Sequence, residues 1–545
     1  MVGSRGRNVA LWTLGALRIL VTLSCAREPG GIPCLCTHAV VRDNDGKLLS
    51  WSKQDSPYAH VTDLAWKRLV AIPAQENGLP TYFTHSRFHP ETYEGDGWPH
   101  NPAGLNAMLI ESALRYHAFS GDRSAIEFAQ RLADHQLAHG TTPHDWEWPN
   151  VPFSSAEADS TEYGGVDDSE CEGCGRGDGL GVIEPDKVAE LGFSYLQLFK
   201  TTRESRYRDA AEACADALAR HVRVGSPNDS PWPFRVNART NVPKENYTAH
   251  VIASIQLFDE LGKLGIGDRQ NYERARGIAW DWLFEVPMKN GHWSGYFEDI
   301  PIATSPAENP NQYAPLMTAR YLLEHPEHDP DWKTHVENLL AFTSNHFATD
   351  ANNERGHQFG AEVISEQKRD MAKMGSHTAR FASVLALYSE RTSDALAKER
   401  AFRSFNWATY ACDFNGVVAV GPDVNEGYWF SDGYGDYIRH FLVGMGALPE
   451  WAPAGEDHLL ASSSVVQEIT YDACSITYRT HDPSGSDVLR LRHEPLDITS
   501  VDSGGEVSGV HFTKAAAPRG GFVVRVQRSA SNVVIRLGGG ECTLP

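Results

Sequence analysis

Two kinds of helical pattern alternate along most of the chain. The first kind is apolar or small on most faces, and its six members begin near Pro102, Asp186, Tyr247, Asn311, Met374 and Gly433. The second kind is amphipathic with a charged face, and its six members begin near Thr62, Arg123, Ser205, Arg269, Asp331 and Ala395. Because a helix that is apolar all round belongs inside a fold and an amphipathic helix on its surface, we expect an inner and an outer set.

The pairs recur with a period of about 60 residues, which is typical of a repeat architecture. A single pair would be an ordinary helical hairpin, but six pairs in phase predict a closed double ring, the (α/α)6 toroid, over residues 61–452. The first interval is longer than the others because residues 151–180 are inserted there. This insertion is rich in Ser, Gly, Asp and Glu and has neither a helical nor a strand period.

The pattern changes after Trp451. Residues 458–545 contain short runs such as VVQEITY and GGFVVRVQR, in which apolar and polar residues alternate, and Gly, Ser, Asp and Asn separate these runs. Such alternation predicts a small antiparallel β-sandwich. The expected fold class is therefore mainly α, with an (α/α)6 toroid followed by a β-sandwich.

The N-terminal residues 1–26 have the pattern of a secretory signal peptide. Arg5 and Arg7 precede an apolar stretch, and the small residues Ser24, Cys25 and Ala26 follow it. Cys25 is alternatively a site for a lipid anchor. We expect an exported protein, periplasmic, secreted or lipid-anchored, in which residues 27–60 form an N-terminal extension. No later segment is long and apolar enough to span a bilayer.

Charge and cysteine content narrow the partners. The 545 residues include 49 basic and 71 acidic side chains, a formal net charge of −22, which repels nucleic acid and anionic membranes. Cys171 and Cys174 lack a second pair or a neighbouring His, so the spacing favours a local disulfide over zinc. Cys214 and Cys412 fall in apolar helical patterns that predict buried thiols. We expect no cofactor, although the acidic insertion could hold a structural calcium ion.

The loops that lead into the inner helices hold the residues of chemical interest. In a double ring all inner helices point the same way, so these loops gather at one mouth. Aromatic faces stack on pyranose rings, whereas carboxylates, amides and Arg bind hydroxyl groups, and helix N-termini favour an anionic group. The substrate-binding candidates are Trp98, His100, Asn101, Glu184, Trp232, Arg235, Arg239, Tyr247, Trp293, Tyr296, Tyr313, Arg380, Trp429, Tyr434 and Tyr437.

Through this repeat and these aromatic and acidic loops, the chain resembles the (α/α)6-toroid carbohydrate-active enzymes over about residues 60–450. That class includes unsaturated glucuronyl hydrolases and toroid polysaccharide lyases. The resemblance implies an oligo- or polysaccharide substrate. It transfers no catalytic residue, because no family's complete motif is present. Toroid prenyltransferases and lanthionine cyclases are disfavoured, since the inner-helix patterns contain no Cys/His zinc constellation.

A glycoside hydrolase is the first functional hypothesis, and it requires two carboxyl groups across the scissile bond. Asp432 and Asp436 open the last inner helix among aromatic residues, and Glu298 and Asp299 follow the segment WSGYF. A simple structural alternative exists for each pair. Asp432 could cap the helix N-terminus, and Glu298 and Asp299 could form a solvated acidic turn.

A polysaccharide lyase is the second hypothesis, and a non-catalytic glycan-binding protein is the third. In a lyase, His377 or a Tyr would remove the C5 proton of a uronate whose carboxylate is neutralised by Arg235, Arg239 or Arg380. A lone His is more often structural than catalytic. The hydrolase remains the preferred hypothesis, with a substrate that could contain uronate.

Product analysis separates the three hypotheses. A lyase creates a carbon–carbon double bond conjugated to the uronate carboxylate, so digestion of uronate polysaccharides should raise the ultraviolet absorbance. A hydrolase should instead release reducing ends without that absorbance, and a glycan-binding protein should do neither. An absorbance increase would contradict the preferred hydrolase hypothesis.

Overall fold

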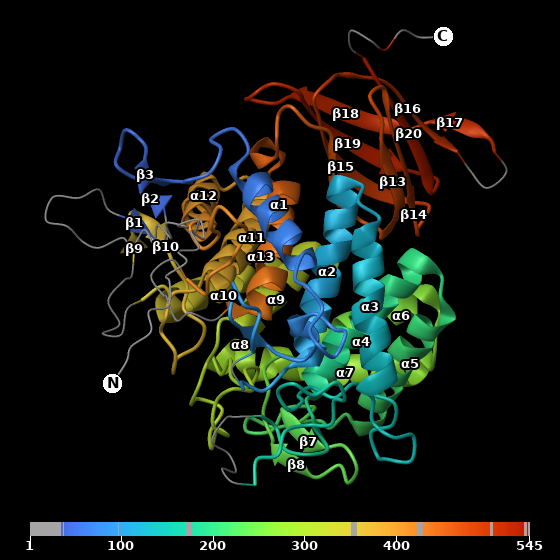
Figure 1. Ribbon diagram of the computed structural model, residues 1–545. Coiled ribbons are helices and arrows are strands. Elements are labelled where there is room, and N and C mark those ends of the chain that lie inside the picture. Colours follow the sequence, from blue (N-terminus) through green and yellow to red (C-terminus); the bar gives the residue numbers. More distant parts are fainter. Residues whose placement is uncertain are drawn as a thin grey trace, which may run out of the picture.

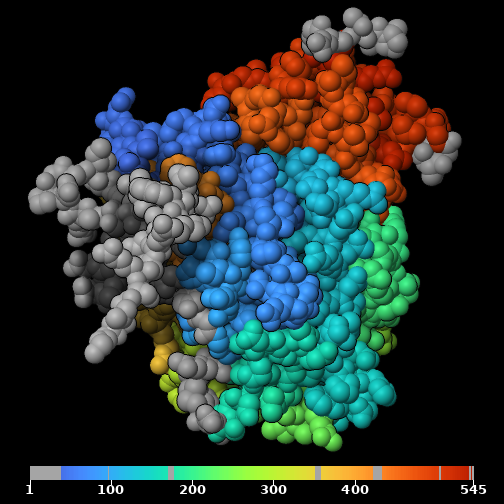
Figure 2. Space-filling view, viewed as in Figure 1, coloured from blue at the N-terminus to red at the C-terminus, as the bar shows by residue number. Residues whose placement is uncertain are grey.

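The computed structural model describes residues 34–35, 38–95, 97–169, 177–349, 357–421, 429–501, 505–538 and 542. Helices form the body of the molecule, and a β-sandwich lies against one end of it (Figure 1). The space-filling view shows the orange and red sandwich seated directly on the blue and cyan helical surface, without a gap between them (Figure 2).

Six inner helices form a closed ring. Each of them contacts the next one along the chain, and the sixth contacts the first. They are α2 (Pro102–Ser120), α4 (Pro185–Thr202), α6 (Ile252–Leu264), α9 (Tyr313–Glu324), α11 (Gly375–Thr392) and α13 (Ser431–Ala447). Backbone pairing also closes the ring, because β5 (Arg87–Phe88) of the first repeat pairs with β11 (Trp429–Phe430) of the last.

Six outer helices surround this ring, each packed against an inner partner. They are α1 (Pro57–Val70), α3 (Ser124–His139), α5 (Ser205–His221), α7 (Arg269–Glu285), α10 (Trp332–Phe347) and α12 (Ala395–Thr409). A short helix, α8 (Pro287–Asn290), follows α7. The predicted (α/α)6 toroid is therefore confirmed.

The burial of the two sets follows their sequence patterns. In α7 the buried residues are Tyr272, Ala275, Ala279, Trp282 and Leu283, which form a single stripe at helical spacing. In α11 nearly every residue from its first turn through Ser389 is buried, as expected for a helix enclosed on all sides.

Two helix starts differ from the predicted ones for local reasons. Helix α1 begins at Pro57 rather than near Thr62, because proline is well suited to the first helical position. Helix α6 begins at Ile252 rather than near Tyr247. The preceding residues are held in a loop, where the Thr248 hydroxyl donates to the Gly295 carbonyl at 2.6 Å.

The loops at the N-terminal ends of the inner helices form short ribbons. The largest is an antiparallel three-stranded sheet of β6 (Val182–Ile183), β7 (Arg235–Asn237) and β8 (Pro243–Glu245). In Figure 1, β7 and β8 lie at the bottom, at the opposite end of the toroid from the sandwich. Another two-stranded ribbon, β9 (His357–Gln358) with β10 (Ala361–Glu362), precedes α11. Two more, β1 (Cys34–Leu35) with β2 (His38–Ala39) and β3 (Val41–Arg42) with β4 (Leu48–Leu49), precede the outer helix α1.

The C-terminal region is a sandwich of two antiparallel sheets. One sheet has the order β12 (His458–Ser462), β15 (Gly485–Leu491), β19 (Phe522–Arg528), β18 (His511–Ala516). The other has the order β13 (Val466–Tyr471), β14 (Ser475–Thr480), β20 (Asn532–Leu537), β16 (Pro495–Val501), β17 (Val507–Gly509). Alternate residues of both sheets form one shared apolar core, which confirms the predicted sandwich.

The sandwich is attached to the C-terminal ends of the first inner helices. The ring of His458 stacks on Phe119 with 3.8 Å between centroids, and the Tyr471 hydroxyl donates to the Ala118 carbonyl at 2.6 Å. Gln467 donates to the Lys200 carbonyl of α4 at 2.6 Å. These bonds satisfy carbonyl groups that a helix end leaves open.

Some of the cysteines lie among the described residues and others do not. Cys214 and Cys412 are buried free thiols, as predicted. Cys474 and Cys542 form a disulfide that the sequence reasoning did not identify. Cys171 and Cys174 lie outside the described residues, as do residues 1–26. Among the helices that are described, none has the length and apolarity needed to cross a membrane.

The closeness of the inner and outer layers can be tested at Gly444 of α13. A Cβ at this position would lie 2.5 Å from the ring of Phe405, which is fully buried in α12. We expect Gly444→Ala to lower the free energy of unfolding by about 1–3 kcal/mol in denaturant titration, because the overpacked ring cannot move away. The matched control is Gly277→Ala in α7, where nothing lies within 4 Å, and there we expect a gain of up to about 1 kcal/mol. Equal effects at both sites would contradict this packing.

Candidate active site

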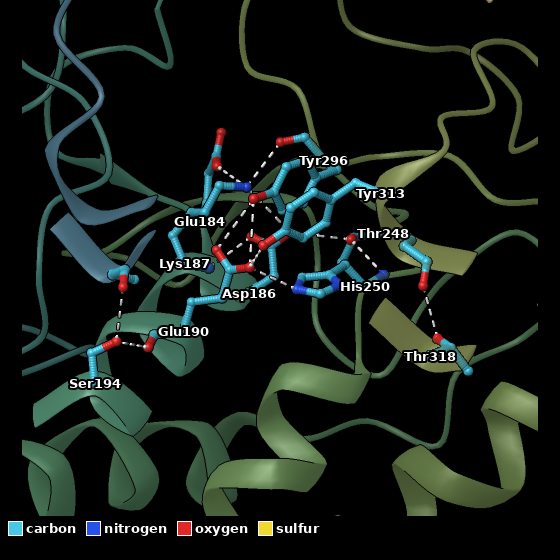
Figure 3. Close-up of polar contacts among 12 residues, drawn as sticks. Glu184, Asp186, Lys187, Glu190, Ser194, Thr248, His250, Tyr296, Tyr313 and Thr318 are labelled. Carbon is cyan, nitrogen blue, oxygen red and sulfur yellow. Dashed lines mark hydrogen bonds and ion pairs between the residues drawn. The ribbon is translucent and has the colours of Figure 1, made fainter. Parts of the chain in front are cut away.

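The first turns of α4 carry a group of charged residues into the mouth of the ring. Glu184 precedes the helix, Pro185 starts it, and Asp186, Lys187 and Glu190 follow. Residues four apart share a helix face, so Asp186 and Glu190 point together toward α6 and α9. Figure 3 shows these side chains converging with His250, Tyr296 and Tyr313.

Lys187 is buried at the centre of this group. Its Nζ lies 3.3 Å from Glu184 and 3.7 Å from Asp186, and it donates to the Tyr296 carbonyl at 2.9 Å. The ammonium also lies 3.4 Å from the centroid of the Tyr296 ring, a cation–π contact. Burial disfavours the charged ammonium, but the neighbouring carboxylates outweigh this effect and raise the pKa of Lys187.

Glu190 is a hydrogen-bonded carboxylate. It accepts from the Tyr313 hydroxyl at 2.6 Å, lies 3.0 Å from His250 Nε2, and accepts from the Tyr296 hydroxyl at 3.5 Å (Figure 3). The rings of Tyr296 and Tyr313 stack with 3.7 Å between centroids, which fixes both hydroxyls. Although burial favours the neutral form, the bond to His250 and the charges of His250 and Lys187 lower the pKa of Glu190 to about 2. Glu190 is therefore ionised at neutral pH.

Glu298 has the opposite character. It follows Tyr296 and Phe297 in the loop before α9, and it is partly exposed. Burial of its carboxyl, together with the charges of Asp299 and Asp178, outweighs the effect of Lys187 and raises the pKa of Glu298 to about 8. Glu298 is therefore protonated at neutral pH. Glu184 and Asp186 also have raised pKa values, but both are almost fully buried.

Arg235 holds the loops of the mouth together. This buried guanidinium lies 2.9 Å from Asp178 of the insertion, 3.4 Å from Glu245 of β8 and 3.8 Å from Glu184. It also donates to the Glu298 carbonyl at 2.7 Å. Arg235 therefore positions the Glu298 backbone and is itself surrounded by carboxylates.

Deeper in the ring, Asp436 lies between two guanidinium groups. It pairs with Arg380 of α11 and with Arg439 of α13, whose Nε lies 2.9 Å from the carboxylate. Arg380 also stacks on the Tyr313 ring at 4.3 Å and donates to Gln312 at 3.0 Å. Two Arg residues already engage this buried carboxyl, which suits a structural role better than proton donation to a ligand.

His377 is buried in the first turn of α11. Its ring centroid lies 6.0 Å from that of Phe297, so it borders the loop that carries Glu298. Burial and the neighbouring Arg380 hold the pKa of His377 well below its usual range, so the imidazole is neutral.

Several aromatic candidates pack away from this cluster. Trp232 donates to the Leu218 carbonyl of α5 at 2.8 Å, and Tyr437 donates to the Ala408 carbonyl of α12 at 3.1 Å, so both bind outer helices. Tyr247 bonds the His292 carbonyl and packs near Trp282, and Trp293 packs near Phe342. The Tyr434 hydroxyl accepts from the Val418 amide at 3.4 Å.

The other candidates occupy separate parts of the mouth. Arg87 lies over the Trp98 ring at 4.7 Å, and His100 is fully buried near Tyr163. Asn101 immediately precedes α2, and Arg239 lies in an exposed turn after β7. The side chains of Trp429 and Asp432 lie outside the described residues.

The sequence reasoning missed Lys187, Glu190 and His250. A signal was present, because a carboxylate and an ammonium on a helix that is otherwise apolar all round are rarely buried without a partner. Among the described residues, no group of three or more His, Cys, Asp or Glu side chains is arranged to hold a metal ion. In the insertion, Asp178 pairs with Arg235 and Asp168 with Lys244.

No family model matches the sequence, and no curated protein matches it either. Solved structures that are similar include a family 76 glycoside hydrolase from a bovine Bacteroides thetaiotaomicron strain, with 11% identity and a TM-score of 0.47 over 72% of this chain and 78% of that one. A cellobiose 2-epimerase from Spirochaeta thermophila has 12% identity and a TM-score of 0.49 over 72% and 97%. An unsaturated glucuronyl hydrolase specific for heparin has 12% identity and a TM-score of 0.43 over 71% and 96%. These proteins are similar to this chain in fold only. The toroid fold of this chain is established independently by its own closed ring of helices.

The role of Lys187 can be tested by Lys187→Met, which keeps the length of the side chain and removes the charge. Removing one partner of a buried ion pair leaves the others uncompensated, so we expect a loss of about 3–5 kcal/mol in the free energy of unfolding at neutral pH. The loss should shrink as the pH falls, because Glu184 and Asp186, whose pKa values are raised, can take up protons.

The control is Lys289→Met, which removes an exposed ammonium paired with Glu285. Exposed pairs contribute less than about 1 kcal/mol, so this variant should unfold almost like the wild type. If Lys187→Met were equally harmless, the ammonium would not hold the carboxylates together.

Proposed function

We propose that this protein is a carbohydrate-active enzyme, specifically a glycoside hydrolase acting on an oligo- or polysaccharide at the mouth of the toroid. One observation carries the proposal. Two partly accessible carboxyl groups, Glu298 and Glu190, both within the field of Lys187, have pKa values pushed to opposite sides of neutrality. Such a pair provides a proton donor and an anion at the same pH.

In this proposal Glu298 is the general acid. Cleavage of a glycosidic bond leaves an oxygen that must be protonated as the bond breaks, and a carboxylic acid with a pKa near the working pH serves this purpose. The bond from Arg235 to the Glu298 carbonyl holds the acid at a fixed place in its loop. The adjoining Tyr296 and Phe297 are buried with Tyr313 in one apolar cluster, which anchors the loop that carries Glu298.

Glu190 is the ionised partner. It would either accept the proton of the attacking water or stabilise the positive charge that develops at the anomeric carbon. The hydrogen bonds from Tyr313 and His250 keep it ionised and oriented. The step balances: the leaving oxygen receives the proton of Glu298, and water adds its hydroxyl to the anomeric carbon. The remaining proton of the water passes to Glu190, or to the Glu298 carboxylate where Glu190 only stabilises the charge.

The lyase alternative is less well supported. It needs cations that can neutralise a uronate carboxylate, and both Arg235 and Arg380 already pair with buried carboxylates, which leaves Arg239 in its exposed turn as the remaining candidate. The feature in favour of a lyase is the neutral imidazole of His377, which could accept the C5 proton of a uronate.

We also propose that the protein is exported, as its N-terminal sequence predicts. The disulfide between Cys474 and Cys542 supports this, because such bonds persist in oxidising compartments.

The acid and the anion can be tested by Glu298→Gln and Glu190→Gln. An amide can neither give nor take the required proton, so we expect each variant to lose about 10²- to 10⁴-fold in kcat. The wild-type rate should fall as the pH rises through about 8, where Glu298 loses its proton. Toward acid pH the rate should stay high until Glu190 is protonated near 2 or the protein unfolds.

The control is Glu273→Gln, which changes an exposed carboxyl on the outer helix α7 and should leave kcat unchanged. If Glu298→Gln kept wild-type turnover and the alkaline limb of the pH profile, Glu298 would not be the acid. Loss of activity in His377→Ala alone would favour the lyase.

A further inference from the structure

The mouth carries more carboxyl groups than cations. Among the described residues, the start of α4 contributes the carboxyls of Glu184, Asp186 and Glu190 near Lys187 and Arg235. The loop before α9 contributes Glu298 and Asp299, and Asp178 and Glu245 lie beside Arg235. His250 adds a further positive charge when it is protonated. A ligand that reaches Glu298 therefore lies near more carboxyl groups than cations.

The cations that contact this group of carboxyls are already engaged. Lys187 contacts Glu184, Asp186 and a backbone carbonyl, and its remaining face covers the Tyr296 ring. Arg235 contacts three carboxylates and the Glu298 carbonyl, and its side chain is 1% exposed. Arg380, further in, pairs with Asp436 and stacks on Tyr313.

Helix N-termini at the mouth do not reverse this balance. Their positive ends attract anions, but at α4 the acidic residues Glu184 and Asp186 already occupy the N-terminal turn. Burial is the main cause of the raised pKa values of Glu184, Asp186 and Glu298, and the charges of neighbouring carboxylates raise them further.

We infer that the sugar bound at this mouth is neutral and carries no carboxylate, a conclusion that rests on the proposed hydrolase function. Hydroxyl groups of a neutral sugar donate hydrogen bonds, which suits a site rich in acceptor oxygens. A uronate would bring a negative charge beside the carboxyls of Asp299 and Asp178, and Lys187 and Arg235, the cations that contact this group, are already held in ion pairs. This narrows the substrate class that the sequence left open, which included uronate polymers.

The test compares one polymer in two forms. A uronate polysaccharide is bound before and after chemical reduction of its carboxyl groups to hydroxymethyl groups, so that chain, linkage and length stay the same. Binding is measured by calorimetry with the Glu298→Gln variant, because this variant is expected not to cleave the ligand. The ligands are several uronate polymers in both forms, together with neutral plant and fungal glycans. We expect at least about tenfold tighter binding of the reduced form wherever a polymer binds. Tighter binding of the uronate form, or no binding of any neutral glycan, would overturn the inference.

A charge variant gives an independent readout. Asp299→Asn removes one carboxylate from the mouth and should narrow the gap between the two forms by strengthening uronate binding. Asp497→Asn removes an exposed carboxylate from β16 in the sandwich and should leave the gap unchanged. An unchanged gap in Asp299→Asn would contradict the electrostatic explanation.

The two proposals fail separately. Selective binding of neutral glycans without any cleavage by the wild type would sink the hydrolase assignment and leave the charge preference standing. Cleavage of uronate polymers with release of reducing ends would support the hydrolase assignment and contradict the preference for neutral sugars.

Discussion

The ion-pair network around the buried ammonium of Lys187 is the interaction on which the mouth of the toroid depends. Four carboxyls on two elements face this one charge: Glu184, Asp186, Glu190 and Glu298. Without it, the buried carboxyls at the start of α4 would lose the cation that compensates their charge. It helps to keep Glu190 an anion, whereas burial and the charges of Asp299 and Asp178 keep the proton on Glu298 despite Lys187.

The ring makes that difference of environment possible. Glu190 lies one turn inside α4, where the loop before α6 supplies His250 and the start of α9 supplies Tyr313. Glu298 lies on a loop, with a backbone bond from Arg235 and with Asp299 beside it. Helices therefore position the anion and loops position the acid, so the loops could change specificity without disturbing the closed core.

Much of the fold could be predicted from the sequence, and less of the site. The alternation of helices such as α11, buried on all faces, with helices such as α7, buried along one stripe, is a local pattern, and it predicts both the ring and the inner and outer layers. The direction of a loop aromatic is not local. Trp232 looks like a sugar-stacking residue, but its indole bonds the Leu218 carbonyl of an outer helix. The pairing of Arg235 with Asp178 joins segments far apart in sequence, and nothing local in either segment predicts it.

The most direct test of the account is the titration of Glu298 itself. Carbon-13 NMR of protein labelled at the Glu side-chain carboxyls, compared with Glu298→Gln, isolates the signal of this one group. The account predicts a carboxyl that titrates near 8 in the wild type and is missing in the variant. If the missing signal instead titrates near the ordinary glutamate value of about 4.3, Glu298 is an anion at neutral pH and cannot be the proton donor.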